Sequence, residues 1–158
     1  MKNISFITNI RTATLREIQD LSTDQLNAIP TGFNNNIIWN AGHLVASEQR
    51  MLYSRSGNAP LVSSEFFDKY QKGTRPNGYI DEEAIEEIKK LLMFSIEKFE
   101  QDYKNNLFTN YESWSTSYGN TISNLDDAIA FLPFHEGLHL GCIKALKKLT
   151  LSNASVRL

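Results

Sequence analysis

The sequence predicts an all-α protein, a four-helix bundle that forms a single domain over residues 1–158. In four long segments, apolar residues recur at spacings of three and four, which places them on one face of a helix. No segment shows the sustained alternation of a convincing strand. There is also no low-complexity tract, and no linker long enough to separate two domains. Four amphipathic helices can bury their apolar faces around one core, and the chain length suits one core.

The first helix carries an apolar stripe that begins at Ile4 and ends near Leu21. Ser22 and Gln25 then form the pattern of a capping box, in which each side chain binds the backbone of the other. A short helix is therefore expected to restart at this point. Pro30 stops it, because proline lacks the backbone N–H that helix propagation requires.

The second long helix is expected from about residue 35 to residue 56, and Gly57 suits its C-terminal stop. The connection that follows, residues 57–80, contains three aromatic side chains whose exposure to water would be costly. We therefore expect them to pack as a lid or a short helix. These side chains are Phe66, Phe67 and Tyr70.

The third long helix opens at Asp81, and acidic residues fill its first turn, where they suit the positive end of the helix dipole. A polar and aromatic connection, residues 105–122, leads to the last helix. Ser123 and Asp126 predict a capping box at its start, and its apolar pattern continues to about Thr150. The stripe of the third helix consists of Ile85, Ile88, Leu92, Ile96, Phe99 and Tyr103.

Composition narrows the classes of partner. The net charge is −2, with 41% hydrophobic and 22% charged residues, so the chain offers no strongly basic surface for nucleic acid or anionic lipid. No apolar run reaches the roughly 18 residues of a membrane span, and the N-terminal segment lacks the apolar core of a signal peptide. Cys142 is the only cysteine, which excludes an intrachain disulfide. These features predict a cytoplasmic protein that acts on a small molecule rather than on nucleic acid or a membrane.

The chain has three histidines, and all three fall on predicted helices. His135 and His139 are four residues apart, so they share one helix face and can chelate one ion. His43 lies on the second long helix, and bundles build metal sites from side chains on facing helices. The alternative is a polar cluster of histidines in the core that binds no metal.

Residues 135–139 also spell H-E-x-x-H, which is the signature of zinc metalloproteases. In those enzymes the third ligand usually follows the motif downstream. The residues after His139 include no histidine, aspartate or glutamate. The pattern therefore predicts a pair of metal ligands but not a protease.

Four segments resemble the DinB-like, YfiT-like superfamily: IIWNAGHLVASEQRML at 37–52, LDDAIAFLPFHEGLHLGCI at 125–143, LSTDQLNAIP at 21–30 and FDKYQKGTRP at 67–76. The resemblance implies an up-down-down-up bundle that is often a homodimer. It also implies a divalent ion, zinc or nickel, held by His43, His135 and His139. Relatives include S-transferases that use a low-molecular-weight thiol, bacillithiol or mycothiol, as co-substrate, and the superfamily is also described as hydrolase-like.

For three further residues the sequence leaves two possible roles open. Glu136 is the candidate catalytic residue, as a general base or as a group that orients a ligand histidine, or it forms an interhelical pair. Arg50 either binds an anionic substrate or makes a surface ion pair. Cys142 replaces a glutamine common in the family and is either a small buried apolar residue or a thiol near the metal.

Three glycines inside predicted helices, Gly42, Gly137 and Gly141, carry a cost in helix stability. Close approach of the second and last helices is the expected compensation, since it would also bring the histidines within reach of one ion.

Two functional classes remain. The first is a metal-dependent enzyme, either a thiol S-transferase or a hydrolase, and the second is a non-catalytic dimeric bundle that binds metal as a sensor or interaction module. An open cleft at the metal, lined by Glu136 or by a residue of the 57–80 connection, favours the enzyme. A site sealed by the aromatic residues of the third helix and the loops favours the second class.

Overall fold

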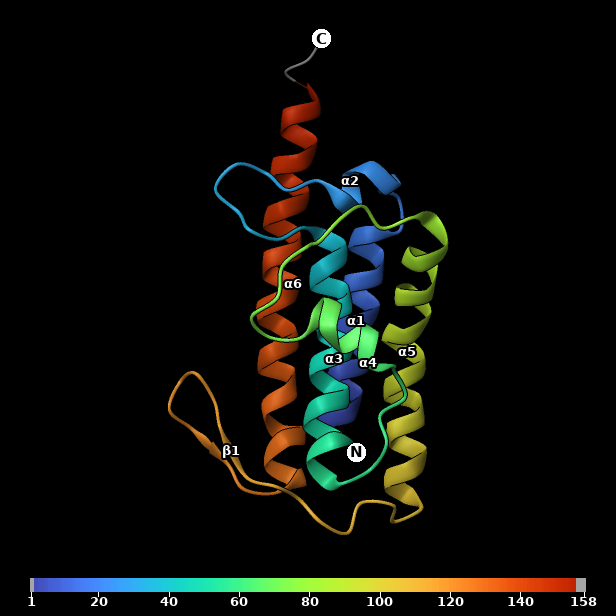
Figure 1. The fold of residues 1–158 in the computed structure, drawn as a ribbon, viewed down its shortest axis with the longest axis vertical. Coiled ribbons are helices and arrows are strands. Elements are labelled where there is room, and N and C mark those ends of the chain that lie inside the picture. Colours follow the sequence, from blue (N-terminus) through green and yellow to red (C-terminus); the bar gives the residue numbers. More distant parts are fainter. Residues whose placement is uncertain (1, 156–158) are drawn as a thin grey trace.

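The computed structural model describes residues 2–155, with side chains described through residue 152. Figure 1 shows a bundle in which α1 and α6 run in one direction while α3 and α5 run in the other, so the expected up-down-down-up order is confirmed. The four long helices are α1 (Lys2–Ile18), α3 (Ile37–Leu52), α5 (Glu82–Lys104) and α6 (Leu125–Ser155).

Short elements connect the long helices. They are α2 (Thr23–Asn27), the 3-10 turn η1 (Ser54–Ser56) and α4 (Ser64–Tyr70), which packs against α3. The capping box that begins α2 is confirmed, with both reciprocal hydrogen bonds between Ser22 and Gln25. Gly57 ends the turn after α3 with a left-handed φ of +73°, as the sequence predicts. The aromatic segment of the 57–80 connection is the expected short helix, α4.

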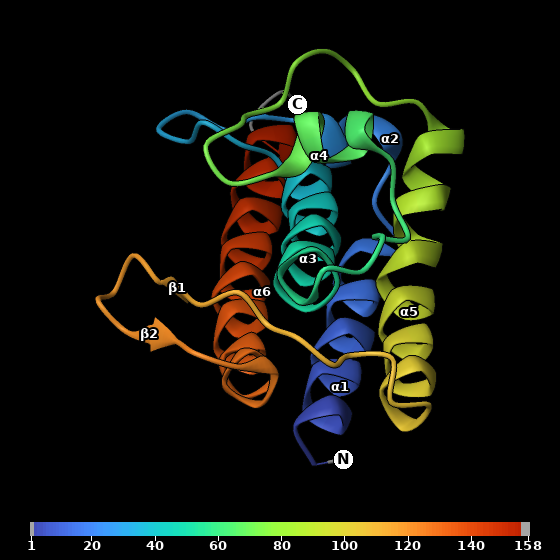
Figure 2. The ribbon, with the colours of Figure 1, turned by 60° about the horizontal axis from the view of Figure 1, so that its bottom comes forward.

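The connection before α6 differs from expectation, because it contains a small antiparallel hairpin. Its strands, β1 (Trp114–Ser115) and β2 (Thr121–Ile122), pair Trp114 with Ile122. Strands of two residues are too short to leave an alternating pattern in the sequence. Figure 2 shows the hairpin beside α6, projecting from the bundle.

The start of α6 also differs from expectation. The capping side chain is Asn124, whose Oδ1 accepts a hydrogen bond of 2.9 Å from the backbone N–H of Asp127. Asp127 in turn accepts one from the backbone N–H of Ser123 at 2.9 Å. The box predicted from Ser123 and Asp126 was therefore misplaced by one residue. Asparagine caps a helix as well as serine does, so the sequence pattern alone did not separate the two positions.

The core consists of two apolar clusters, one toward each end of the bundle. One contains Leu44, Leu92 and Ile143, and the other contains Leu52, Ile96 and Leu132. Between the two clusters, each of the four long helices carries at least one polar residue that is completely buried. No helix within residues 2–155 is long and apolar enough to cross a membrane.

These buried polar residues form a layer around Arg11, whose side chain is fully buried. Its guanidinium donates to Glu136 Oε1 from Nε at 2.9 Å and from Nη2 at 2.7 Å. Nη1 donates to the Leu92 carbonyl and to Ser95 Oγ, each at 2.9 Å. Glu48 completes the layer, with Oε2 at 3.7 Å from Nη1. We call these residues, Arg11, Glu48, Ser95 and Glu136, the polar layer.

The glycines do not bring α3 and α6 together as the sequence suggested. A Cβ added at Gly137 or Gly141 would meet no heavy atom within 4 Å, so neither glycine marks a close approach. A Cβ at Gly42 would lie 2.6 Å from Cδ1 of Tyr70, so this glycine makes room for the ring of α4. The tight contact lies between α3 and the short helix, not between the two ligand-bearing helices.

We predict that Gly42→Ala lowers the free energy of unfolding by about 1–3 kcal/mol, because the Tyr70 ring would have to move. Gly141→Ala is the matched control, and it should be neutral or raise stability by up to about 1 kcal/mol, since alanine is the better helix former. Urea unfolding measures both. Equal effects of the two substitutions would contradict the packing described for Gly42.

Candidate metal centre

Three histidines converge between α3 and α6. His43 comes from α3, while His135 and His139 come from successive turns of α6. One ring nitrogen from each side chain lies within 4.8 Å of the other two, an arrangement that could hold a metal ion. The ring centroid of His43 is 5.4 Å from that of His135 and 4.7 Å from that of His139. The structure therefore brings together the three residues that the sequence singled out.

The environment of His43 fixes which of its nitrogens is free. Nδ1 lies 2.6 Å from the backbone carbonyl of Tyr70. Because a carbonyl only accepts, Nδ1 carries the proton and Nε2 keeps its lone pair. Ser47 Oγ is 3.1 Å from that Nε2. Trp39 stacks on the ring at 4.8 Å with planes 11° apart, which holds the ring orientation.

His139 is fixed in the same way by Asn40. Its Nδ1 lies 2.8 Å from Asn40 Oδ1, and the Nδ2 of that amide donates to the Asn36 carbonyl at 2.7 Å. The second contact sets the orientation of the amide, so Oδ1 faces the histidine as an acceptor. His139 therefore also presents an unprotonated Nε2. Hydrogen bonds of this kind, on the far nitrogen of the ring, are the usual support of metal-ligating histidines.

His135 differs from the other two, because its Nδ1 is buried and has no hydrogen-bond partner. A buried polar atom without a partner is costly, so this ring gains more than the other two from a bound group. No protein group holds the His135 ring through Nδ1, and the three rings each offer one nitrogen within 4.8 Å of the others, which fits a divalent ion such as zinc or nickel.

The electrostatics keep the rings neutral. Burial, together with the neighbouring His139, His43 and Arg11, lowers the pKa of His135 to about 3. Burial, together with His43, lowers the pKa of His139 to about 4. Burial also lowers the pKa of His43, against the opposing effect of the Tyr70 carbonyl. Neutral imidazole is the form that binds metal, so the site is prepared for a cation.

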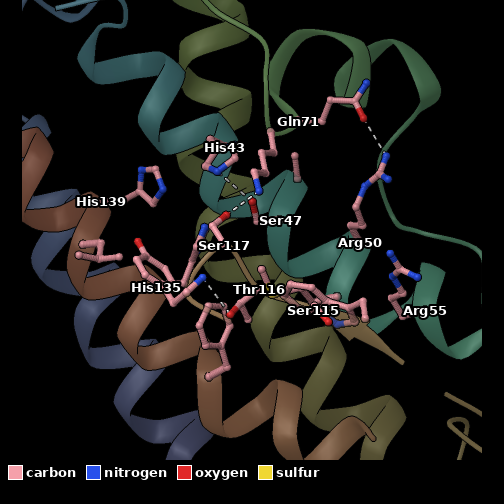
Figure 3. A pocket seen from close by; sticks show the side chains of 17 residues that line it. His43, Ser47, Arg50, Arg55, Gln71, Ser115, Thr116, Ser117, His135 and His139 are labelled. Atoms are coloured by element: carbon pink, nitrogen blue, oxygen red, sulfur yellow. Dashed lines mark hydrogen bonds between the residues drawn. The ribbon is translucent and has the colours of Figure 1, made fainter. Parts of the chain in front are cut away.

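A cavity of about 580 Å³ opens onto the three histidines. Figure 3 shows His43, His135 and His139 on one side of this cavity, and Arg50, Arg55 and Gln71 on the other. Ser47 lies between the two groups. The β1–β2 hairpin supplies Trp114, Ser115, Thr116, Ser117 and Tyr118 to the lining, and α6 supplies Phe131 and Leu138.

The remaining sequence candidates occupy different positions. Glu136 is completely buried, binds Arg11 and does not line the cavity, which matches the interhelical pair among its expected roles. Cys142 packs against the apolar cluster that contains Leu44, and burial raises the pKa of its thiol. It is not part of the histidine cluster. Arg50 does line the cavity, and its Nη2 donates to Gln71 Oε1 at 2.8 Å.

Sequence reasoning missed the groups that orient the ligands. The Tyr70 carbonyl is a backbone atom, so no side-chain pattern could mark it. Asn40 is one turn before His43 on α3 and is completely buried, and a buried asparagine inside an apolar helix was a usable signal. Ser47, one turn after His43, extends the same polar stripe along the helix.

Comparison with known proteins gives one family. A family model described as the DinB superfamily matches residues 7–143, which is most of the chain and includes all three histidines. No curated protein matches the chain significantly.

We predict that the stability of the metal-free protein falls as the pH drops from about 6.5 toward about 4. In the unfolded chain the histidines titrate near 6.5, so below that pH the unfolded state binds protons that the folded state excludes. Above about pH 6.5 this contribution to stability is fully present.

Urea unfolding over this pH range, compared between the parent and His135→Gln, isolates the histidine contribution, because other groups titrate alike in both proteins. The parent should lose more stability on acidification than the variant. Parallel pH profiles would contradict the lowered histidine pKa values.

Proposed function

The chain belongs to the DinB superfamily, and from its histidine cluster we propose that it is a divalent-metal-dependent enzyme. His43, His135 and His139 are the proposed ligands, and zinc or nickel is the proposed ion. The observation that carries this proposal is three neutral nitrogen donors meeting at the wall of an open cavity. Structural zinc sites are closed by four protein ligands, whereas catalytic sites keep three and leave a position for water or substrate.

A divalent ion bound here would act as a Lewis acid that lowers the pKa of a bound water or thiol toward neutrality. The residues of the chain hold the ligand histidines in place and form the walls of the cavity. The Tyr70 carbonyl and Asn40 hold His43 and His139 in the tautomer that leaves Nε2 unprotonated and able to bind the ion. The Ser47 hydroxyl, 3.1 Å from His43 Nε2, lines the cavity and can exchange a hydrogen bond with a substrate. The cavity has the size of a small-molecule site.

The proposed reaction is transfer of a low-molecular-weight thiol to an electrophile, with hydrolysis as the second possibility. Among the described residues, no aspartate or glutamate lines the cavity. A nucleophile must therefore lose its proton without help from a carboxylate at the site. A thiol, with an ordinary pKa near 8.5, does this far more readily than water, whose pKa is about 15.7. This difference favours S-transfer.

We propose that Glu136 is a positioning residue. A catalytic role for Glu136 stays a prediction, and its burial favours action through its neighbours over contact with substrate. It anchors the α6 turn that carries His135 through the two hydrogen bonds from Arg11. Loss of this anchor would let the adjacent ligand move.

The non-catalytic alternative calls for a centre sealed by loop aromatics. Here Trp114 and Tyr118 of the hairpin line the cavity beside the histidines but leave it open. The homodimer stays a prediction in both proposals, and Phe134 of α6, exposed by 49%, provides apolar surface for it.

We predict that the zinc- or nickel-loaded protein forms a thioether from a low-molecular-weight thiol and an alkyl halide, faster than the chelator-treated protein does. The His139→Ala variant should lose this rate enhancement, because one ligand is missing. Mass spectrometry measures the thioether, and p-nitrophenyl acetate tests hydrolysis in parallel. Full metal occupancy with neither activity would point to the non-catalytic bundle.

A further inference from the structure

The charged side chains that line the cavity all have the same sign. They are Arg50, Arg55 and Lys72, and no described aspartate or glutamate joins them. The chain as a whole has 18 acidic and 16 basic residues, so this separation is local and does not follow from composition. A cavity lined by one sign of charge concentrates ligands of the opposite sign.

Arg50 is held in place by neutral groups. Its Nη2 donates to Gln71 Oε1 at 2.8 Å, and its guanidinium carbon lies 5.6 Å from the centre of the Phe67 ring. Neither partner carries a negative charge, so both orient the guanidinium without neutralising it. Its remaining N–H groups are in the fork geometry that matches a carboxylate or a phosphate.

The other two cations differ in how far they are neutralised. Lys72 Nζ donates to Ser117 Oγ at 2.6 Å, a contact that joins the segment after α4 to the tip of the hairpin and leaves the charge uncompensated. Arg55 is paired with Glu112 at 2.9 Å, and the Glu112 side chain is 74% exposed. Arg50 and Lys72 are therefore the cations available to a ligand.

The distance between these cations and the histidines limits the shape of the ligand. His43, Ser47 and Arg50 follow one another along α3, and seven residues of helix rise about 10 Å. Apolar side chains also line the cavity. They are Met51, Trp114, Phe131 and Leu138. A ligand that reaches both ends has an apolar body roughly the length of a phenylpropyl group.

We propose that the cavity binds a small molecule that carries a carboxylate or phosphate group at Arg50 and Lys72 and an apolar body that extends toward the three histidines. This inference rests on the proposed function only for the reacting end of the ligand. The anionic end is recognised by side chains that take no part in the metal centre.

The test uses 3-phenylpropionate and 2-phenylethylphosphonate, which share one phenylethyl body, as anionic probes and 3-phenylpropionamide as the neutral isostere of the carboxylate, with binding measured by calorimetry. Titrations are made on the chelator-treated protein and on the zinc-loaded protein. In the metal-free protein, at least one anion should bind about tenfold or more tightly than the amide. Which anion binds identifies the carboxylate or the phosphate as the natural group.

The double variant Arg50→Gln with Lys72→Gln should lose this preference and keep the parent's zinc content. Arg16→Gln with Lys148→Gln, two exposed cations outside the cavity, is the charge-matched control and should keep the preference. The proposal is overturned if no probe binds, if the double variant still prefers the anion, or if the preference requires zinc. Failure of the proposed function would instead appear as absent zinc uptake by the parent, while the metal-free titration still decides the anion site.

Discussion

The guanidinium of Arg11 holds together the four helices on which the site is built. Its five N–H groups are all used, and their acceptors lie on α3, α5 and α6, while Arg11 itself belongs to α1. The side chain is completely buried, as are Glu48 and Glu136. Removing one partner from a buried ion pair leaves an uncompensated charge, at a cost of about 3–5 kcal/mol. The bundle therefore tolerates little displacement of any helix at this level.

The polar layer sits at the level of the histidines. Arg11 donates to the carbonyl of Leu44, which follows His43, at 3.4 Å, and to the carboxylate of Glu136, which follows His135. One side chain thus fixes the backbone next to a ligand on each of the two ligand-bearing helices. Apolar packing on either side of the layer stabilises the bundle, but it is not directional. The hydrogen bonds are directional, so they set the position of α3 and α6 relative to each other along the bundle axis. This supports a centre whose nitrogen atoms must meet within a few ångströms.

The amino-acid sequence was sufficient to predict the long helices, their order and the three histidines. Strong helical periodicity and the four-residue spacing of His135 and His139 both survive folding unchanged. The sequence was insufficient where tertiary contacts decide which neighbours a side chain meets. Gly42 faces Tyr70 and not α6, and Glu136 turns away from the cavity toward Arg11. In the sequence, nothing distinguishes Arg11 from an ordinary surface residue of a helix. Only the packed bundle shows that two glutamates and two backbone carbonyls surround it.

The central claim is that one ion is held across α3 and α6 by three histidines, and metal content tests it most directly. The protein is purified without a histidine tag and measured by mass spectrometry for metal beside His43→Ala and, as control, Cys142→Ala. We predict about one equivalent of zinc or nickel in the parent and in the cysteine variant, and its loss from the histidine variant. A parent that takes up no metal from zinc, nickel or manganese would contradict the account, and so would a His43→Ala variant that keeps its full equivalent.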